Sequence, residues 1–283
     1  MEFINSLLAI NPNYILIGLM VLFYSLEQLL GNQFKFDKRP QHLFQNSLFY
    51  VVFFLVGILW SFVSVFSIEW LNNHQIGLFY LVQLPLWLKL LVGVALFDLV
   101  SYWFHRLSHV VPFLWRFHRV HHSDTTMDAS TNFRGHPLES FLWFGSSNIL
   151  AAAVFGLDLL TLGLYLFITM IFFVLQHSNL RFPKWLDKSL GLVITTPNIH
   201  KVHHEQDQSY TDSNFSDIFI LWDRLFGTYK SKPVEQIKLG LKEFDEEKKQ
   251  TFWYLMKSPF LEIKRVESEE LNKNTNAITQ LNK

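Results

Sequence analysis

Ten of the twelve histidines in this chain lie between positions 105 and 204, as three clusters and two single residues. The clusters read HRLSH, HRVHH and HKVHH, and the ten residues are His105, His109, His118, His121, His122, His136, His177, His200, His203 and His204. Residues three and four apart on a helix share a face, so each cluster can direct several imidazoles towards one point. Neutral imidazole is a ligand for zinc, copper, iron and nickel. Ten such donors are more than one ion can use, so the pattern predicts two metal ions.

Two further polar residues, Asp98 and Tyr102, precede His105 and His109 with the spacing of a single helical stripe. An Asp inside an apolar segment needs a partner, because an isolated charge is costly there. A metal-bound histidine usually donates its second ring N–H to a carboxylate or a carbonyl. We therefore expect Asp98 and Tyr102 to orient the histidines. The alternative for Asp98 is an ion pair with Lys89 or a cap on a contact within the bundle.

Other polar residues near these motifs carry weaker signals. Asp128, Glu139 and Asp207 are expected either to offset the charge of the metals or to cap helices. His42 and His74 stand alone in the sequence, so we do not expect them to bind metal. The segment 211–217 (TDSNFSD) reads as a polar turn, and the segment 222–229 (WDRLFGTY) reads as a packed helix that stops at a glycine.

Long apolar segments must position these residues. Five of them are long enough to cross a bilayer, which takes about 20 mainly apolar residues: 14–30, 47–67, about 86–103, 138–157 and 159–176. The short sequence Gly156-Leu157-Asp158 joins the last two and predicts a hairpin. The fold class expected from this pattern is all-α, an integral-membrane helical bundle with a cytoplasmic, histidine-rich helical cap.

The distribution of Lys and Arg predicts how these segments are oriented. Residues 1–13 and 68–77 contain neither, whereas basic residues follow the first, third and fifth apolar segments. Under the positive-inside rule the N-terminus faces out and every histidine cluster faces the cytoplasm. No basic segment precedes the first span, so we expect no cleaved signal peptide. The predicted location is the cytoplasmic membrane of a bacterium or the endoplasmic reticulum of a eukaryote, as a multi-pass protein.

The composition limits the remaining possibilities. The chain has 283 residues, a net charge of zero and no cysteine. Nothing in this charge balance indicates nucleic acid, and the lack of cysteine excludes disulfides, thiolate zinc sites and iron–sulfur clusters. Composition divides the chain into N-terminal transmembrane helices (1–84), a histidine-bearing domain (85–230) and a polar cytoplasmic tail (231–283). Within the tail, the apolar segment 251–263 is expected to lie on the membrane or dock on the domain, and the last fifteen or so residues are expected to be disordered.

Several of these motifs resemble a known family. HRLSH, HRVHH, FRGHPLE, QHSNL, HKVHH and WDRLFGTY are similar to motifs of the fatty acid hydroxylase / sterol desaturase superfamily of integral-membrane di-iron enzymes. The resemblance covers about residues 85–230 and implies two iron ions held by all ten histidines. It assigns to one ion His105, His118, His121, His200 and His203. It assigns to the other His109, His122, His136, His177 and His204.

The resemblance also implies an activity. It predicts an O2-dependent monooxygenase that hydroxylates a lipid of the sterol, alkylglycerol or fatty-acyl type, taken up from the bilayer. Cleaving an unactivated C–H bond needs a redox metal, which favours iron over zinc. No electron-carrier motif is present, so a separate reductase is expected to supply electrons. A desaturase of the same superfamily is the alternative. A metal-ion transporter is less favoured because it needs ligands at the bilayer midplane, and a haem protein would place single histidines in facing spans.

Overall fold

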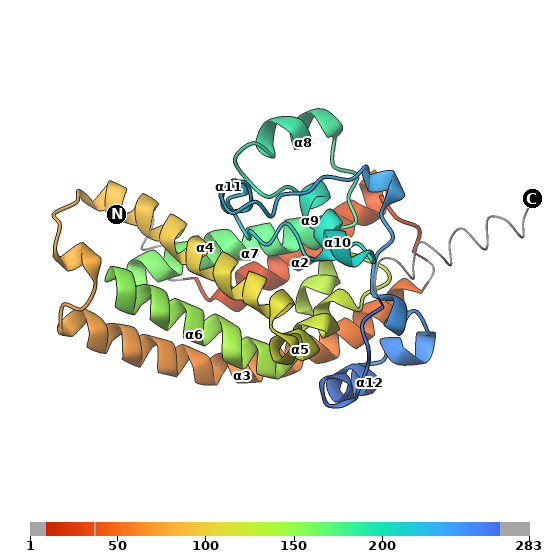
Figure 1. Cartoon of the computed structure of the whole chain (residues 1–283), viewed down its shortest axis with the longest axis horizontal. Coiled ribbons are helices and arrows are strands. Elements are labelled where there is room, and N and C mark those ends of the chain that lie inside the picture. Colours follow the sequence, from red (N-terminus) through yellow and green to blue (C-terminus); the bar gives the residue numbers. More distant parts are fainter. Residues whose placement is uncertain (1–9, 37, 267–283) are drawn as a thin grey trace, which may run out of the picture.

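The computed structural model describes residues 10–36 and 38–266, and it is built from helices (Figure 1). In these ranges there is no β-strand, and only two isolated bridges occur, Asn32 with Leu180 and Glu205 with Leu239. The prediction of an all-α fold is therefore confirmed. The predicted disorder of the C-terminal end concerns residues 267–283 and lies outside the described residues.

Five helices are long and apolar enough to cross a membrane. They are α2 (Pro12–Leu30), α3 (Arg39–Asn73), α4 (Leu86–Val110), α6 (Pro137–Phe155) and α7 (Leu159–His177). Each contains one of the five apolar segments predicted from the sequence, apart from a residue or two at the C-terminal end of the fourth. With 35 residues, α3 is about 52 Å long and extends beyond a hydrocarbon core of about 30 Å. The protein is an integral-membrane helical bundle.

Short local signals set where the helices begin and end. Four helices begin with a proline: Pro12, Pro112, Pro137 and Pro197. Proline suits this position because the first N–H of a helix has no partner within the helix, so its loss costs no hydrogen bond. The predicted hairpin between α6 and α7 is present, and it turns at Gly156, whose φ of +73° suits a residue without a Cβ.

The turn between α6 and α7 also carries an ion pair that marks this end of the bundle. Asp158 caps α7 by accepting a hydrogen bond from Thr161 N at 2.9 Å. The same side chain pairs with Lys89 of α4 at 2.8 Å. Lys89 is therefore not available to Asp98, and the ion pair considered for Asp98 from the sequence is wrong.

The main apolar core joins α3, α4, α6 and α7. Its buried members include Ile68, Val94, Phe97, Ala151 and Leu162, which come from all four helices. α2 packs against α7 on another side of the bundle. These helices hold the ends of α4 and α7 close together. His105 and His109 lie in the last two turns of α4, and His177 is the last residue of α7.

Shorter helices complete the histidine-bearing end of the bundle. They are α5 (Pro112–His122), α8 (Lys184–Leu190), α9 (Pro197–His203), α10 (Gln208–Thr211), α11 (Leu221–Leu225) and α12 (Phe252–Lys257), with 3-10 turns between them. α5 follows α4 after a single residue, Val111, so the chain reverses over a very short connection. The C-terminal apolar segment docks on the domain, where Phe252 and Leu255 are buried against Phe49 and Trp115.

Candidate metal centre

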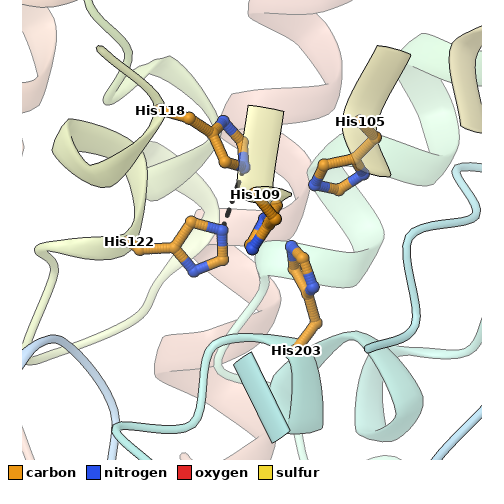
Figure 2. A group of neighbouring side chains, drawn as sticks. All are labelled: His105, His109, His118, His122 and His203. Atoms are coloured by element: carbon orange, nitrogen blue, oxygen red, sulfur yellow. Dashed lines mark hydrogen bonds between the residues drawn. The ribbon is translucent and has the colours of Figure 1, made fainter. Parts of the chain in front are cut away.

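Nine of the ten predicted histidines form two neighbouring groups. The first group contains five buried residues, His105, His109, His118, His122 and His203 (Figure 2). Each offers one ring nitrogen, and these five nitrogens lie within 4.8 Å of one another. The residues come from α4, α5 and α9, so three helices must meet for the group to form. Figure 2 shows the five rings turned towards one common point.

The second group contains four residues, His121, His177, His200 and His204. Their Nε2 atoms face each other closely: His177 lies 3.1 Å from His121 and 3.0 Å from His200, and His200 lies 3.2 Å from His204. The two groups are adjacent, since the rings of His122 and His204 stack with centroids 4.5 Å apart. Two cations could therefore lie side by side.

This grouping differs from the one that the resemblance implies. Residues four apart stay together, as in His105 with His109, because they lie one above the other on the same helix face. Neighbours in sequence are separated, so His121 and His122 enter different groups, as do His203 and His204. One turn of α5 and one turn of α9 thus contribute to both groups.

His136 lies outside both groups. It caps α6, where its Nδ1 accepts a hydrogen bond from Leu138 N at 3.2 Å. Its Nε2 lies 3.2 Å from the carbonyl oxygen of Met256. Both ring nitrogens are thus engaged, and the ring packs against Phe117 and Phe260. The structure gives His136 a role in holding the C-terminal segment, and does not bring it to the grouped nitrogens.

Hydrogen bonds fix the orientation of six of the nine rings. In each of these the Nδ1 atom lies near an oxygen, so the Nε2 atom points into the group. In four of them this oxygen is a backbone carbonyl, at 2.6–3.0 Å. The pairs are His105 with Phe215, His121 with Arg134, His177 with Phe173, and His203 with Ser213. In the other two the oxygen belongs to a carboxylate: Asp212 lies 3.1 Å from Nδ1 of His109, and Glu139 contacts Nδ1 of His118. This is the arrangement typical of metal-bound histidine.

The turn at 211–217 supplies three of these oxygens, from Asp212, Ser213 and Phe215. The sequence identified this segment only as a polar turn. Two of the three contacts use backbone carbonyls, and every residue type has a backbone carbonyl, so the sequence carries no signal for them. The acidic residues in TDSNFSD were the available signal, because carboxylates commonly accept from a metal-bound histidine.

The hydrogen bonds of Asp98 and the hydroxyl of Tyr102 go to another segment of the chain and not to the grouped histidines. Asp98 accepts hydrogen bonds from Ile218 N and Phe219 N, both at 3.0 Å, and from Trp222 Nε1 at 2.8 Å. The hydroxyl of Tyr102 lies 2.8 Å from Thr228 Oγ1. Both residues share a stripe of α4 with the histidines, as the spacing indicated, but they lie one and two turns farther from the end of the helix. They therefore meet the segment 218–228.

Burial keeps the imidazoles outside the membrane spans neutral. Desolvation, together with the positive charge of Arg265, lowers the pKa of His118 to about 3. Desolvation also lowers the pKa of His121 to about 4, with a second contribution from His118. Neutral rings are the form that binds metal. Nε2 of His109 and Nε2 of His203 are buried without a hydrogen-bond partner among the described residues, which fits donors that await a cation.

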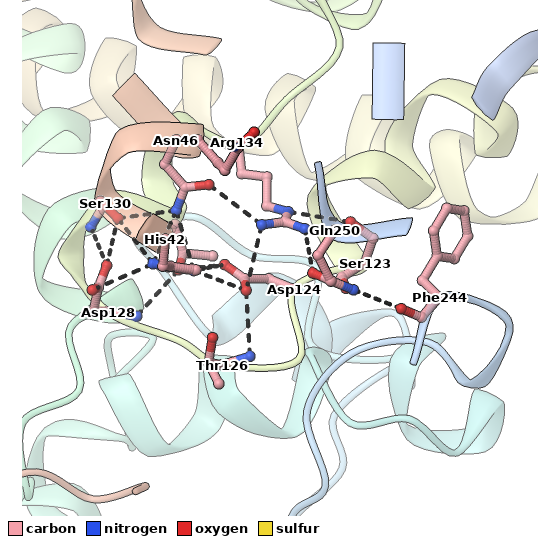
Figure 3. Close-up of polar contacts among 12 residues, drawn as sticks. His42, Asn46, Ser123, Asp124, Thr126, Asp128, Ser130, Arg134, Phe244 and Gln250 are labelled. Carbon is pink, nitrogen blue, oxygen red and sulfur yellow. Dashed lines mark hydrogen bonds and ion pairs between the residues drawn. The ribbon is translucent and has the colours of Figure 1, made fainter. Parts of the chain in front are cut away.

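A buried polar network lies beside the second group (Figure 3). His42 Nε2 contacts both carboxylate oxygens of Asp124, at 2.8 and 2.9 Å. The guanidinium of Arg134 lies 3.6 Å from Asp124, and both side chains are almost fully buried. Burial raises the pKa of Asp124, but Arg134 and His42 outweigh this effect and hold it well below its usual range. Asp124 follows His122 by two residues, so the network anchors the end of α5 to α3.

The C-terminal segment reaches the first group through Arg265. Its guanidinium donates to Asp212 Oδ1 at 2.8 Å and lies 4.1 Å from the centre of the Trp115 ring. The same oxygen of Asp212 accepts from His109. Arg265 thus fixes the carboxylate that orients His109, although more than 150 residues separate the two along the chain.

We expect Arg265→Ala to weaken metal binding by about 10- to 100-fold, because disturbing the partners of metal-bound histidines typically has this effect. The measurement is a titration of the metal-free protein with Co²⁺, whose absorption reports the ligand field. Arg116→Ala is the matched control, since Arg116 donates to the carbonyl of Leu261 in the same segment and is not placed beside Asp212. Equal affinities for the two variants would show that Arg265 is not needed to position His109.

Comparison with known proteins assigns the central part of the chain to a family. The fatty acid hydroxylase family model matches residues 90–228, a range that includes all nine grouped histidines. This part of the chain belongs to the fatty acid hydroxylase family. The family domain begins within α4 and ends just after α11. The resemblance inferred from the histidine motifs is thereby confirmed.

Curated relatives of the family domain act on lipids according to their names. Alkylglycerol monooxygenase of Danio rerio is 33% identical over 174 residues, which cover 59% of this chain and 35% of that protein. The Homo sapiens protein of the same name is 31% identical over 164 residues, which cover 55% of this chain and 33% of that protein. Ornithine lipid hydroxylase of Rhizobium tropici is 27% identical over 171 residues, which cover 53% of this chain and 44% of that protein. The chain therefore spans only about a third to less than half of the length of these relatives. No solved structure matches it.

Proposed function

We propose that this protein is a membrane-bound di-iron monooxygenase that hydroxylates a lipid with O2. The observation that carries the proposal is the pair of adjacent histidine groups at the ends of membrane-spanning helices. Five nitrogens of one group and four of the other would hold one iron ion each. The fatty acid hydroxylase match and the names of the relatives support lipid hydroxylation as the reaction.

The chemical character of the donor set favours this assignment. The nine donors are neutral nitrogens, and the carboxylates that hydrogen-bond to these rings, Asp212 and Glu139, contact Nδ1 atoms from outside the groups. Iron bound there would supply the activation of O2 and the redox change that C–H hydroxylation requires. The chain itself would hold the ions, fix each ring through its Nδ1 oxygen and keep the site buried. A separate reductase would supply electrons.

The substrate is proposed to be a membrane lipid of the alkylglycerol, sterol or fatty-acyl type. Alkylglycerols come first because two alkylglycerol monooxygenases are above 30% identity to this chain. The groups lie at the ends of α4 and α7, so a lipid can approach from the bilayer. The Lys and Arg distribution supports a cytoplasmic location for them. A lipid desaturase is the alternative within the same family.

A metal-ion transporter is the less favoured reading from another class. It would need free ligands near the bilayer midplane. Asp98 lies midway along α4, yet both of its oxygens accept hydrogen bonds from the segment 218–222. That carboxylate is therefore engaged by the protein and offers no vacant oxygen to a passing ion.

The proposal is tested by two measurements on the full chain. Protein purified in detergent should contain two iron ions per chain by elemental analysis, one for each group. Cells that make the protein and are fed an alkylglycerol should accumulate a lipid that has gained one oxygen atom. A lipid that has instead lost two hydrogen atoms would assign the chain as a desaturase. Iron-free protein and an unchanged lipid profile would overturn both readings.

A further inference from the structure

The segment 214–229, called here the α11 loop, runs along α4 away from the histidines. Three contacts trace its path. Thr228 meets Tyr102, and Ile218 and Phe219 meet Asp98 one turn farther along α4. At the tip, α11 contributes to an apolar groove of about 330 Å³ whose lining includes Leu91 and Leu221. The loop therefore follows α4 for about three helical turns.

The position of these contacts along α4 gives their depth in a membrane. Lys89 pairs with Asp158 at the α6–α7 turn, which marks one end of the span. Asp98 lies nine residues from Lys89, about 13 Å along the helix, which is close to half of a hydrocarbon core of about 30 Å. Leu91 lies farther still from the histidines. The tip of the α11 loop is thus level with the middle of the bilayer or beyond it.

We propose that the α11 loop is a re-entrant element, which enters the bilayer from the histidine side and places α11 against hydrocarbon chains. Its ends return to the same side, because Asn214 N donates to Thr228 O at 3.1 Å and Lys230 N donates to Asn214 Oδ1 at 2.8 Å. Gly227, with a φ of +71°, makes the turn that follows α11.

The polar groups of the loop meet the requirement that a membrane imposes. Non-helical backbone is tolerated at membrane depth only where protein or trapped water satisfies it. Asp98 accepts from two backbone N–H groups at the tip. Asp223 accepts from Phe215 N at 2.8 Å and from Ser216 N at 2.9 Å. The conspicuous Asp within an apolar span is thus explained as a cap for the re-entrant backbone.

The outward surface of the tip is apolar, as contact with lipid requires. Leu221 and Leu225 expose 53% and 64% of their area, and neighbouring Leu192 and Val193 are similarly exposed. The tip also carries Arg224, which would be costly in hydrocarbon if it were free. Its guanidinium instead donates to Gly191 O at 2.9 Å and stacks on the Tyr229 ring at 4.2 Å.

Depth measurements on single cysteines test the proposal, because the native chain has none. Spin labels would be attached to Leu221→Cys and Leu225→Cys in full-length protein in phosphatidylcholine nanodiscs. Depth is read from collisions with O2 relative to a water-soluble nickel chelate. Leu96→Cys is the membrane control, because Leu96 lines the same groove as Leu221 and lies two residues from Asp98, and Lys248→Cys is the aqueous control, because Lys248 is exposed.

The label at Leu221 should report the depth of the Leu96 label to within about one helical turn, ~5 Å. A label at Leu221 that the nickel chelate reaches as readily as it reaches Lys248 would overturn the proposal. The same outcome at Leu225 alone would move the tip to the interface and would also contradict it. The readout does not depend on iron or on lipid hydroxylation, so it is independent of the proposed function.

Discussion

His204→Ala should lose about half of the bound iron, whereas His136→Ala should keep nearly all of it. His204 belongs to the four-nitrogen group, and removing it leaves three protein donors for that ion. The other group keeps its five nitrogens, so one ion per chain should remain. His136 has both ring nitrogens engaged outside the groups. Its loss removes a helix cap, worth about 1 kcal/mol, and its contact with Met256, but no metal ligand. Elemental analysis of the two purified variants makes the comparison.

This pair of variants separates the geometry seen here from the assignment that the family resemblance implies. By the resemblance His136 would serve the same ion as His204, and the two variants would lose iron equally. His74→Ala controls for handling losses, since His74 is exposed and its Nδ1 lies 2.8 Å from Trp70 O. Full iron in His204→Ala would mean that the four-nitrogen group is not a metal site. Lipid product should fall in His204→Ala by far more than protein yield.

The second large effect is expected for Asp124→Asn, which we expect to destabilise the protein by about 3–5 kcal/mol. The substitution removes the carboxylate between Arg134 and His42, and an unpaired charge buried in protein costs this much. Resistance to unfolding by SDS in mixed micelles, followed by circular dichroism, measures the change.

Glu247→Gln is the matched control for this experiment. Glu247 forms an ion pair with Lys38 at 2.6 Å, but both side chains are more than 60% exposed. Exposed pairs contribute about 0–1 kcal/mol, so little change is expected. If Asp124→Asn unfolds at the same SDS fraction as Glu247→Gln, the buried network does not hold α5 to α3.

Much of this architecture could be predicted from the sequence, for two physical reasons. Apolar length is a direct measure of a membrane span, so all five spans were located. Helical spacing dictates which histidines share a face, so His105 with His109 and His118 with His122 could be expected to converge. The hairpin at Gly156 followed from turn chemistry in a short connection.

The sequence could not predict contacts that depend on tertiary packing or on backbone atoms. His42 was set aside as an isolated histidine, because its partner Asp124 is 82 residues away. The role of Arg265 depends on a C-terminal segment folding back over α5. The spacing of Asp98 placed it on the correct stripe of α4, but it could not show that backbone N–H groups of another segment would occupy that carboxylate.

The nine donors come from the helices α4, α5, α7 and α9 and from His204, the residue that caps α9, in a chain without a single cysteine. Ions bound there would serve as cross-links between distant segments, the role that disulfides have in secreted proteins. A cross-link stabilises the folded state more when the loop that it closes is longer, because the unfolded chain then loses more conformational entropy. A ligand that binds only the folded chain adds its binding free energy to stability. The amount of this protein that a cell retains should therefore follow its iron supply.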